Sequence, residues 1–497
     1  MTPTGEEDFD VVIVGAGISG LNAAYRLQTS MPHLRFAILE ARDCIGGTWS
    51  FWQFPGVRSD SAMSLFGFSW YPWPHTTNMA AAGQIKTYLD EAAASRGIDK
   101  LIRFRHRVTA SRWRSDEARW TIDVDVSRAD GSTEAKTVRA WWLLSCSGYY
   151  DYDRPLPAVI PGIARFGGEV VHPQFWHDAV HHAGKRVVVI GSGATAVTLV
   201  PALVKTAASV TMLQRSPSYV LSLSGRDRAH DLFQRFLPAR WALALNWWLN
   251  MVTETLFVYV VTRFPRFGRR LVRALMKQQL PPDVDMDKHF NPTYNPFEQR
   301  LCFCPDGNFF EALRKSTCQV VTDHIDTVTE TGIRLRSGQF LEADMIVTAT
   351  GLFMRLMGGV PIYVDDEPVA DSVGKRFTWQ GCMLEGVPNA GMILGYTAGT
   401  WTPGADVRTR MMLKVIRHMC ETGSTAATPV LPDAQRARLP RRPALTNSST
   451  YIVDALPRLP LNADVGPWRN GRTWIVDWWH LMVGDVTAGM KFSTAKA

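Results

Sequence analysis

The residues of this chain best suited to chemistry lie in two glycine-rich turns, each directly after a β-rich run. The first run, Phe9–Val14, leads into GAGISG, which places Gly15, Gly17 and Gly20 in a complete GxGxxG. The first glycine permits a tight turn, the second lets backbone amides approach a diphosphate, and the third lets the helix pack closely on the strand. The pattern predicts a dinucleotide site at the start of the chain.

An acidic residue completes this first site. The next β-rich run, Phe36–Leu39, ends at Glu40, and an acid roughly 20 residues past the glycines can accept hydrogen bonds from a ribose. The alternative is a solvated charge at a strand end, but the order of strand, turn, helix and strand favours the nucleotide site.

The second turn differs from the first in one informative place. The run Val187–Ile190 leads into GSGATA, and the following run, Val210–Leu213, ends in Gln214-Arg215-Ser216. A guanidinium replaces the carboxylate, which favours a ribose 2′-phosphate and hence NADPH over NADH. The alternative is a surface arginine. The residues expected to hold NADPH here are Gly191, Ser192, Gly193, Ala194, Thr195, Ala196, Val197, Arg215 and Ser216.

Each turn needs a sheet and helices to position it, so the predicted fold is α/β, with two Rossmann-like dinucleotide-binding domains and a helical insertion. An acid-ended site followed by an arginine-ended one is best explained by a flavoprotein that binds FAD first and NADPH second. We expect a discontinuous FAD-binding domain at 1–154 and 351–497, an NADPH-binding domain at 155–225 and 288–350, and a helical insertion at 226–287.

Length and composition agree with a globular cytoplasmic protein. The 497 residues suggest about three domains, and 46% are hydrophobic and 20% charged. The acidic, polar start MTPTGEEDFD is unlike a secretory signal or a transit peptide. Seven cysteines without a CxxC pair argue against a disulfide framework, a metal site or a dithiol centre. The net charge of +8 suits an anionic cofactor or a membrane surface; nucleic acid would need a basic recognition element that the sequence lacks, and nothing in it specifies an oligomeric state.

Two further segments resemble a known family. Asp43–Asp60 reads DCIGGTWSFWQFPGVRSD, and the motif FxGxxxHxxxW is formed by Phe166, Gly168, His172 and Trp176. The segment Asp43–Asp60 resembles the class B flavin monooxygenases, and the FxGxxxHxxxW motif is similar to the fingerprint of the Baeyer-Villiger monooxygenases. Relatives that oxygenate amines and sulfides usually carry Tyr or Phe at the position of Trp176.

The resemblance covers nearly the whole chain. It continues through Ser147–Asp151, Asn295–Leu313 and Ala349–Gly351 and is strongest to the ethionamide-activating group of the Baeyer-Villiger family. One departure is His177, where the fingerprint usually has Pro or Asp. His172 has two open interpretations, a structural histidine that bridges linker and domain or a direct part in the chemistry.

The resemblance implies a catalytic pair. Arg300 would lie over the flavin and stabilise the negative charge of the oxygenating intermediates, and Asp60 would hold and orient Arg300. A fixed cation in a dry pocket does favour an anionic peroxide and the developing oxyanion; the alternative is a structural ion pair. Many members have a lysine at the position of Gln299 that grips the 2′-phosphate, so more of the NADPH selectivity would fall to Arg215 and Ser216.

The same resemblance implies the remaining cofactor contacts. The nicotinamide half of NADPH would meet Arg58, Ser59 and Asp60. FAD would be bound by Gly15, Gly17, Ser19, Gly20, Glu40, Thr48, Trp49, Ser50, Phe51, Asp60 and the backbone of Val108.

The implied activity is an NADPH- and O₂-dependent oxygenation. NADPH would reduce FAD, and oxygen would be inserted beside a ketone to give an ester or lactone; sulfides are a second substrate class by family habit. One alternative is an amine- or sulfide-hydroxylating flavin monooxygenase, against which Trp176 and Arg300 stand. Another is an FAD-dependent NADPH reductase or electron-transfer protein, whose dithiol form would need a CxxC.

The segment Trp241–Thr262 is about as long as a membrane span and rich in Leu, Val and Trp, but it contains Glu254. A mid-span carboxylate costs about 2.5–3.5 kcal/mol, which argues against a span. Arg263–Lys277 interleaves basic residues with Phe and Leu, which suits the surface of an anionic bilayer. Peripheral membrane association is therefore a hypothesis, and the alternative is a helical insertion packed over the substrate pocket.

The last part of the chain carries three further expectations. Apolar residues from Val407 to Met419 have helical spacing, which indicates core packing. Glu421–Arg442 has the composition of a linker. The four tail tryptophans would form either a staple that closes a domain or part of the pocket wall: Trp468, Trp474, Trp478 and Trp479.

Overall fold

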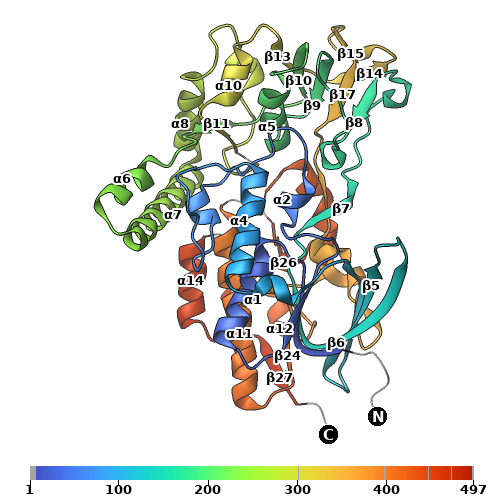
Figure 1. Cartoon of the computed structure of the whole chain (residues 1–497), viewed down its shortest axis with the longest axis vertical. Helices are drawn as coiled ribbons and strands as arrows, with labels where there is room; N and C mark the ends of the chain where they lie inside the picture. The colour runs from blue at the N-terminus through green and yellow to red at the C-terminus, as the bar shows by residue number, and fades with distance from the viewer. Residues whose placement is uncertain (1–6, 300, 397–398, 446, 472, 495–497) are drawn as a thin grey trace.

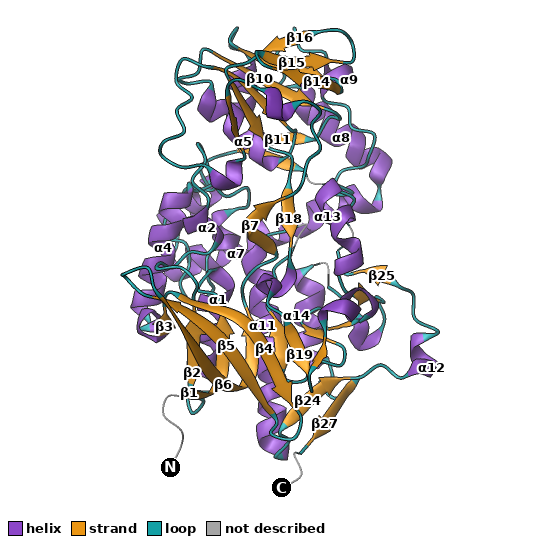
Figure 2. Cartoon of the chain, turned by 90° about the vertical axis from the view of Figure 1, so that its right-hand side faces the viewer, coloured by secondary structure: helices purple, strands orange, loops and turns teal. Residues whose placement is uncertain are grey.

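The computed structural model describes residues 7–299, 301–396, 399–445, 447–471 and 473–494. Two sheets with helices packed on them lie at opposite ends of the molecule, and a narrow pair of strands connects them (Figure 2). The predicted α/β class is confirmed.

The first sheet has nine strands in the order β20-β19-β4-β5-β6-β1-β2-β3, with β23 beside β6. β1 lies between β2 and β6, parallel to both, and Val11, Val12 and Ile13 in it are fully buried. This burial on both faces explains the unbroken apolar run that predicted the strand. The strands are β1 (Glu7–Val14), β2 (Phe36–Leu39), β3 (Ile102–Arg103), β4 (His106–Arg114), β5 (Arg119–Ser127), β6 (Thr133–Ser145), β19 (Ile362–Val364), β20 (Glu367–Pro368) and β23 (Ala390–Met392).

Helices from both ends of the chain cover this sheet. α1 (Ile18–Ser30) follows the first turn, and α11 (Trp401–Thr422) packs against it. The expected helix with an apolar face around Met411, Met412 and Ile416 is confirmed, since all three are buried. Short helices and α4 complete the layer: α2 (Thr48–Phe51), α3 (Met63–Phe66) and α4 (Ala82–Ser95).

The second sheet is parallel and has the order β13-β10-β9-β17-β8. The predicted strands of the second turn lie at its centre, and α5 follows the turn directly. Its elements are β8 (Glu169–Val171), β9 (Arg186–Ile190), α5 (Ala194–Leu203), β10 (Ser209–Gln214), α10 (Asn308–Leu313), β13 (Cys318–Thr322) and β17 (Met345–Thr348). A small antiparallel sheet and further short elements flank it: β11 (Val220–Leu223), α9 (Met286–His289), β12 (Cys302–Pro305), β14 (Ile325–Thr329), β15 (Gly332–Leu335) and β16 (Phe340–Glu342).

The chain passes between the two sheets in β7 (Tyr150–Pro155) and returns in β18 (Leu352–Met354). These two crossings pair with each other in antiparallel fashion, and Figure 2 shows them between the sheets. Both crossings are thereby held in one place, although about 200 residues separate them in the sequence.

Three helices fill residues 228–277 and stand at the left edge of the molecule in Figure 1. They are α6 (Arg228–Phe236), α7 (Ala239–Arg263) and α8 (Pro265–Lys277). Glu254 of α7 accepts hydrogen bonds from the backbone N–H (3.0 Å) and the hydroxyl (2.9 Å) of Thr400, which caps α11. Among the helices in the described ranges, none combines the length and apolarity that crossing a bilayer takes.

The tail corrects one expectation. The prediction of a linker over Glu421–Arg442 is wrong. In this range β24 (Ala426–Pro429) pairs with β27 (Met490–Ser493) and buries Ala426 and Ala427, and a short helix, α12 (Asp433–Arg436), follows. The other tail elements are β21 (Thr378–Trp379), β22 (Met383–Leu384), β25 (Arg442–Pro443), α13 (Thr450–Ala455), β26 (Leu461–Asn462) and α14 (Trp474–Val483).

Two of the four tail tryptophans, Trp468 and Trp474, pack as a domain-closing staple would, whereas Trp478 and Trp479 are exposed. Trp468 is buried against Phe377, and Trp474 packs on the two tryptophans of α7, Trp247 and Trp248. None of the four tail tryptophans lines either of the two pockets described below.

The bond between Glu254 and Thr400 generates a prediction on pH. Burial raises the pKa of Glu254, and the two bonds from Thr400 oppose the shift. A carboxyl whose folded pKa is raised stabilises the fold below its unfolded pKa, and this stability is lost as the pH rises through the folded pKa. We expect Glu254→Gln, which does not titrate, to gain stability relative to wild type as the pH rises above the ordinary pKa of a glutamate and through the raised pKa of Glu254.

Denaturant unfolding at several pH values measures this difference. Glu421→Gln, at an exposed position of α11, is the matched control and should show no such trend. A difference between Glu254→Gln and wild type that stays constant with pH would contradict the assignment.

Candidate functional site

The first glycine turn leaves no room for side chains. Gly15 has φ +103°, and a β-carbon on it would lie 2.9 Å from the carbonyl oxygen of Cys146. A β-carbon on Gly20 would lie 1.9 Å from the carbonyl oxygen of Gly15. β1 therefore turns sharply into α1, and the N-terminus of α1 is presented to any ligand at the turn.

Glu40 lies beside this turn, as the sequence predicts. It ends β2 and is buried, and its carboxylate accepts hydrogen bonds from the backbone N–H groups of Ala16 (2.7 Å) and Arg42 (3.0 Å). One carboxylate oxygen thus fixes the glycine loop, which places the acid where a ribose attached to a diphosphate would lie.

The segment Thr48–Phe51 forms α2 and packs against the first turn. A β-carbon on Gly47, which has φ +57°, would lie 3.1 Å from the α-carbon of Gly17, whereas one on Gly17 would make ordinary contact with Gly47 (3.5 Å), so the tight position is Gly47. The Thr48 hydroxyl lies 3.1 Å from the Tyr152 hydroxyl, and the Phe51 ring packs edge-on against the Tyr152 ring. The predicted FAD contacts of α2 and the glycines are therefore neighbours.

Sequence reasoning missed Arg42 in this group. Its guanidinium donates to the carbonyl of Gly47 (3.0 Å) and to the hydroxyl of Ser50 (3.4 Å), and it lies over the ring of Tyr152 (4.9 Å). A basic residue two positions after Glu40 has no motif of its own, so no sequence signal marked it.

The other predicted FAD contacts surround the same region. The hydroxyl of Ser19 accepts a hydrogen bond from the indole N–H of Trp401 (2.9 Å), and Trp49 packs edge-on against Phe66. Val108 is in β4, whose first residue donates its backbone N–H to the carbonyl of Glu40. Residues from four separate parts of the chain thus converge on the first turn.

The second turn opens onto a cavity of about 650 Å³. Gly191 has φ +138°, and a β-carbon on it would lie 2.3 Å from the carbonyl oxygen of Ala349, whereas one on Gly193 would meet nothing within 4 Å. Seven of the predicted NADPH residues line the cavity: Gly191, Ser192, Gly193, Ala194, Thr195, Arg215 and Ser216. Ala196 and Val197 are instead on the buried side of α5, in the core.

Cationic side chains lie at one end of this cavity. Arg215 is exposed at the end of β10, and the hydroxyl of Ser192 donates to the carbonyl of Ser216 (3.0 Å), which ties the turn to this segment. Gln299 and a second exposed arginine, Arg336, also line the cavity. Arg336 lies between β15 and β16, far from either turn in sequence, so no local pattern could mark it.

The predicted nicotinamide residues lie in a loop fixed to β12. Arg58 donates to the carbonyl oxygen of Phe303 (2.9 Å), and Ser59 is buried. Burial lowers the pKa of the Arg58 guanidinium, and the negative charge of Asp60 opposes the shift. Arg300 lies outside the described residues, and its predicted role stays a prediction; the anchor of Arg58, Phe303, follows it by three positions in the sequence.

The fingerprint residues follow the first crossing and flank β8, the edge strand of the second sheet. A β-carbon on Gly168 would lie 2.4 Å from the carbonyl oxygen of Asp344 and 2.7 Å from the Phe166 ring, so only glycine fits there. Trp176 is buried in the core around α5. Both positions are thus explained by packing.

His172 joins the first crossing to the second. Its Nδ1 accepts a hydrogen bond from the backbone N–H of Gln174 (3.2 Å), so in the neutral ring the proton lies on Nε2, which donates to the carbonyl of Gly351 (3.3 Å). Burial lowers the pKa of His172, and the bond to Gly351 opposes the shift. These contacts support the structural interpretation, in which His172 bridges linker and domain.

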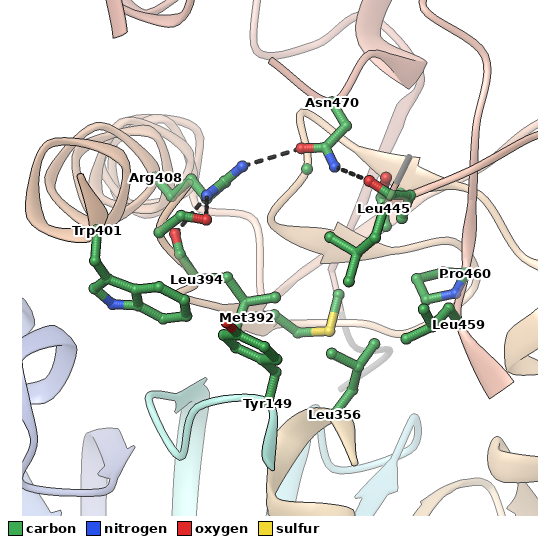
Figure 3. A pocket seen from close by; sticks show the side chains of 14 residues that line it. Tyr149, Leu356, Met392, Leu394, Trp401, Arg408, Leu445, Leu459, Pro460 and Asn470 are labelled. Atoms are coloured by element: carbon green, nitrogen blue, oxygen red, sulfur yellow. Dashed lines mark hydrogen bonds between the residues drawn. The ribbon is translucent and has the colours of Figure 1, made fainter. Parts of the chain in front are cut away.

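A second, small and largely apolar pocket lies beside the start of α11 (Figure 3). Tyr149 stacks on Trp401 at one side of it, with ring centroids 5.2 Å apart. Arg408 forms part of the wall and donates to the carbonyls of Leu394 and Gly395 and to Asn470, as the dashed lines in Figure 3 show. The charge in the wall is therefore bound to the protein's own oxygens.

The residues present fit two dinucleotides. At the first turn, Gly15 and Gly20 leave no room for a side chain, and the buried carboxylate predicted to meet a ribose is held beside the turn. At the second turn, an open cavity is lined by the turn and by Arg215, which the sequence predicts to meet a 2′-phosphate. These features define a flavoprotein oxidoreductase with a second, phosphate-selective nucleotide site.

Comparison with known proteins agrees with this class. A sequence model of the family described as flavin-binding monooxygenase-like matches residues 9–426, and the chain belongs to this family. It is 42% identical over 473 residues to the FAD-containing monooxygenase EthA of Mycolicibacterium smegmatis, covering 95% of this chain and 94% of that one. It is 39% identical to EthA of Mycobacterium tuberculosis, covering 95% and 94%.

Solved structures show the same fold. An oxidized steroid monooxygenase bound to NADP superimposes with a TM-score of 0.77 at 20% identity, over 98% of this chain and all of that chain (100%). The resemblance to class B flavin monooxygenases of the Baeyer-Villiger type, and to the ethionamide-activating group, is therefore confirmed.

The two glycines of the second turn generate a prediction that separates folding from binding. Gly191→Ala forces a β-carbon against a backbone carbonyl at positive φ, so we expect it to cost about 1–3 kcal/mol of stability. Gly193→Ala meets open space and should leave the melting temperature unchanged while weakening NADP⁺ binding, because its methyl group occupies the approach of the diphosphate.

Thermal unfolding and NADP⁺ titration of both variants measure this. Gly193→Ala that binds NADP⁺ as wild type does would show that the diphosphate lies elsewhere. Gly191→Ala with wild-type stability would contradict the close approach to Ala349.

Proposed function

We propose that the protein is an NADPH- and O₂-dependent FAD monooxygenase that converts ketones to esters or lactones, with sulfides as a second substrate class. One arrangement carries the proposal: a carboxylate at the first turn and an arginine at the second, with the Baeyer-Villiger fingerprint between them in the sequence. Names of relatives support it, because EthA is described as an FAD-containing monooxygenase and the steroid monooxygenase binds NADP.

The cofactors assign a role to each turn. FAD, when bound, supplies hydride acceptance from NADPH and activation of O₂. Glu40 would accept hydrogen bonds from the FAD ribose, and the N–H groups at the start of α1 would meet its diphosphate. At the second turn, the N–H groups at the start of α5 would meet the NADPH diphosphate, and Arg215 with Ser216 would hold the 2′-phosphate.

The loop with Arg58 and Asp60 positions the reacting end of NADPH. Its anchor to Phe303 and the burial of Ser59 keep this loop rigid against β12. By resemblance, Asp60 orients Arg300, whose cation favours the build-up of negative charge on oxygen during the transfer. A rigid support is what such a pair needs, because an error of about 1 Å in position costs roughly a hundredfold in rate.

The pocket of Figure 3 has a volume of only about 30 Å³, too small for a ketone as it stands, so it supports the substrate class only through the character of its wall. Its apolar wall includes Leu356, Met392 and Trp401, and its guanidinium is already bonded to backbone and Asn470. Such a wall suits a neutral, apolar carbonyl compound better than a charged amine. An amine- or sulfide-hydroxylating monooxygenase and an NADPH reductase remain the alternatives that the next experiment separates.

Incubation of the purified protein with a ketone panel, NADPH and ¹⁸O₂ tests the proposal. We expect an ester or lactone that carries one heavy oxygen atom, with NADPH and O₂ consumed together. A reductase would oxidise NADPH only with an added acceptor, and a hydroxylase would oxygenate amines or sulfides and leave ketones unchanged. Arg300→Ala should keep NADPH oxidation and lose the ester.

Arg215→Ala tests the choice of NADPH. Loss of a charge-assisted bond to a phosphate costs roughly 1.5–3 kcal/mol, so we expect KM for NADPH to rise roughly 10- to 100-fold. KM for NADH, which has no 2′-phosphate, should change little. Arg334→Ala is the matched control, since Arg334 is exposed on β15 and does not line the cavity. Equal losses for both nucleotides would refute the role of Arg215.

A further inference from the structure

One side of α7 is apolar and turned to solvent along the whole helix. The exposed fractions of Trp241, Trp248 and Tyr259 are 58%, 50% and 59%. A helix on the surface of a soluble protein normally shows its polar side to water. Large exposed side chains recur here at the helical period: Trp241, Leu245, Trp248, Val252, Leu256 and Tyr259.

A second helix extends this surface. Trp474, the first residue of α14, packs edge-on against Trp247 (4.9 Å) and Trp248 (5.5 Å) of α7, so the start of α14 adjoins α7; Figure 1 shows α14 below α7. Trp479 and Met482 of α14 are each 59% exposed. We call the exposed apolar side chains of α7 and α14 the apolar face. Its breadth exceeds the scattered single residues normal for a soluble surface.

The exposed charges on α7, α8 and α14 themselves are all positive, although Asp485, two residues after the end of α14, is an exposed carboxylate. α7 and α14 each contain one acidic residue, and both point inward: Glu254 accepts from Thr400, and Asp477 accepts from the hydroxyl of Tyr396 (2.8 Å). α8 contains no acidic residue. Exposed arginines stand at the ends of α7 and along α8: Arg240, Arg263, Arg266 and Arg270.

We propose that the apolar face docks on an anionic lipid bilayer. An apolar helical surface with tryptophan and tyrosine, flanked by arginines and with no exposed carboxylate on α7, α8 or α14, has the composition of a helix that lies in the membrane interface. A protein partner would form about one hydrogen bond per 100–200 Å², whereas the exposed stripe of α7 offers few polar groups. The hydrocarbon of a bilayer forms no hydrogen bonds with the apolar face, and anionic headgroups complement the arginines.

The opposite side of α7 borders the candidate site. Glu254 binds Thr400 at the start of α11, and the next residue, Trp401, lines the pocket of Figure 3. Docking would therefore place the bilayer outside the same helix whose inner side supports that pocket. If the proposed function holds, apolar substrates dissolved in the membrane would be close to it; the docking itself does not depend on that function.

Vesicle flotation of the FAD-loaded full-length protein tests the docking. We expect the protein to float with phosphatidylcholine vesicles that contain phosphatidylglycerol at low salt, and to float less with pure phosphatidylcholine or at high salt. Wild-type protein that stays at the bottom of the gradient with anionic vesicles at low salt would overturn the proposal.

Variants separate the contributions of the apolar side chains and of the arginines to vesicle binding. Trp248→Glu with Trp479→Glu should abolish flotation, while Phe340→Glu, at an exposed apolar position of β16 at the far end of the molecule (Figure 2), should not. Each arginine near an anionic surface contributes roughly fivefold to binding, so Arg263→Gln with Arg266→Gln should lower it about 25-fold. Retained flavin absorbance shows that each variant is folded.

Two outcomes would assign the apolar face differently. Flotation that survives the tryptophan substitutions would place lipid binding elsewhere. A wild-type dimer in sedimentation velocity that Trp248→Glu splits, together with no flotation, would make the apolar face a contact between copies of this chain.

Discussion

Close backbone approach at the two glycine turns is the constraint on which the rest of the structure depends. At Gly15, Gly20 and Gly191, an added β-carbon would lie within 3 Å of a carbonyl oxygen of a neighbouring segment. The strand can therefore turn into its helix only where no side chain intervenes, and this leaves backbone N–H groups free for a diphosphate. The carboxylate of Glu40 and the guanidinium of Arg215 are suited to bind nucleotides only because each lies beside a turn with this geometry.

The paired crossings bring the two turns into one molecule. β7 and β18 lie side by side, and His172 ties the segment after β7 to Gly351 just before β18. A neutral histidine serves this purpose because one ring nitrogen accepts and the other donates. The fingerprint around Phe166 to Trp176 is thus a packing and linking element in this structure, and the bond between Glu254 and Thr400 adds a second tie through α7.

Much of this arrangement could be predicted from the sequence, because its signals lie within short stretches. Strand, turn and helix follow each other within about 30 residues, and the spacing of apolar residues marks the buried side of a helix within a few turns. The two turns, their flanking elements and the buried face of α11 are of this kind. The prediction of a linker over Glu421–Arg442 failed because β24 is stabilised by pairing with β27, which lies about 60 residues away in the sequence. Arg42 over Tyr152, Arg336 in the cavity and Glu254 at Thr400 had no local signal; the last two partners are 146 residues apart. The domain boundaries and the roles of individual site residues stay predictions.

Anaerobic addition of NADPH to the purified protein, followed by its visible absorbance, tests the central claim that one chain holds FAD and NADPH together. The account predicts a yellow protein whose flavin band bleaches with NADPH and returns when air is admitted. A colourless protein that takes up no FAD on reconstitution, or a flavin band that NADPH leaves unchanged, would contradict it.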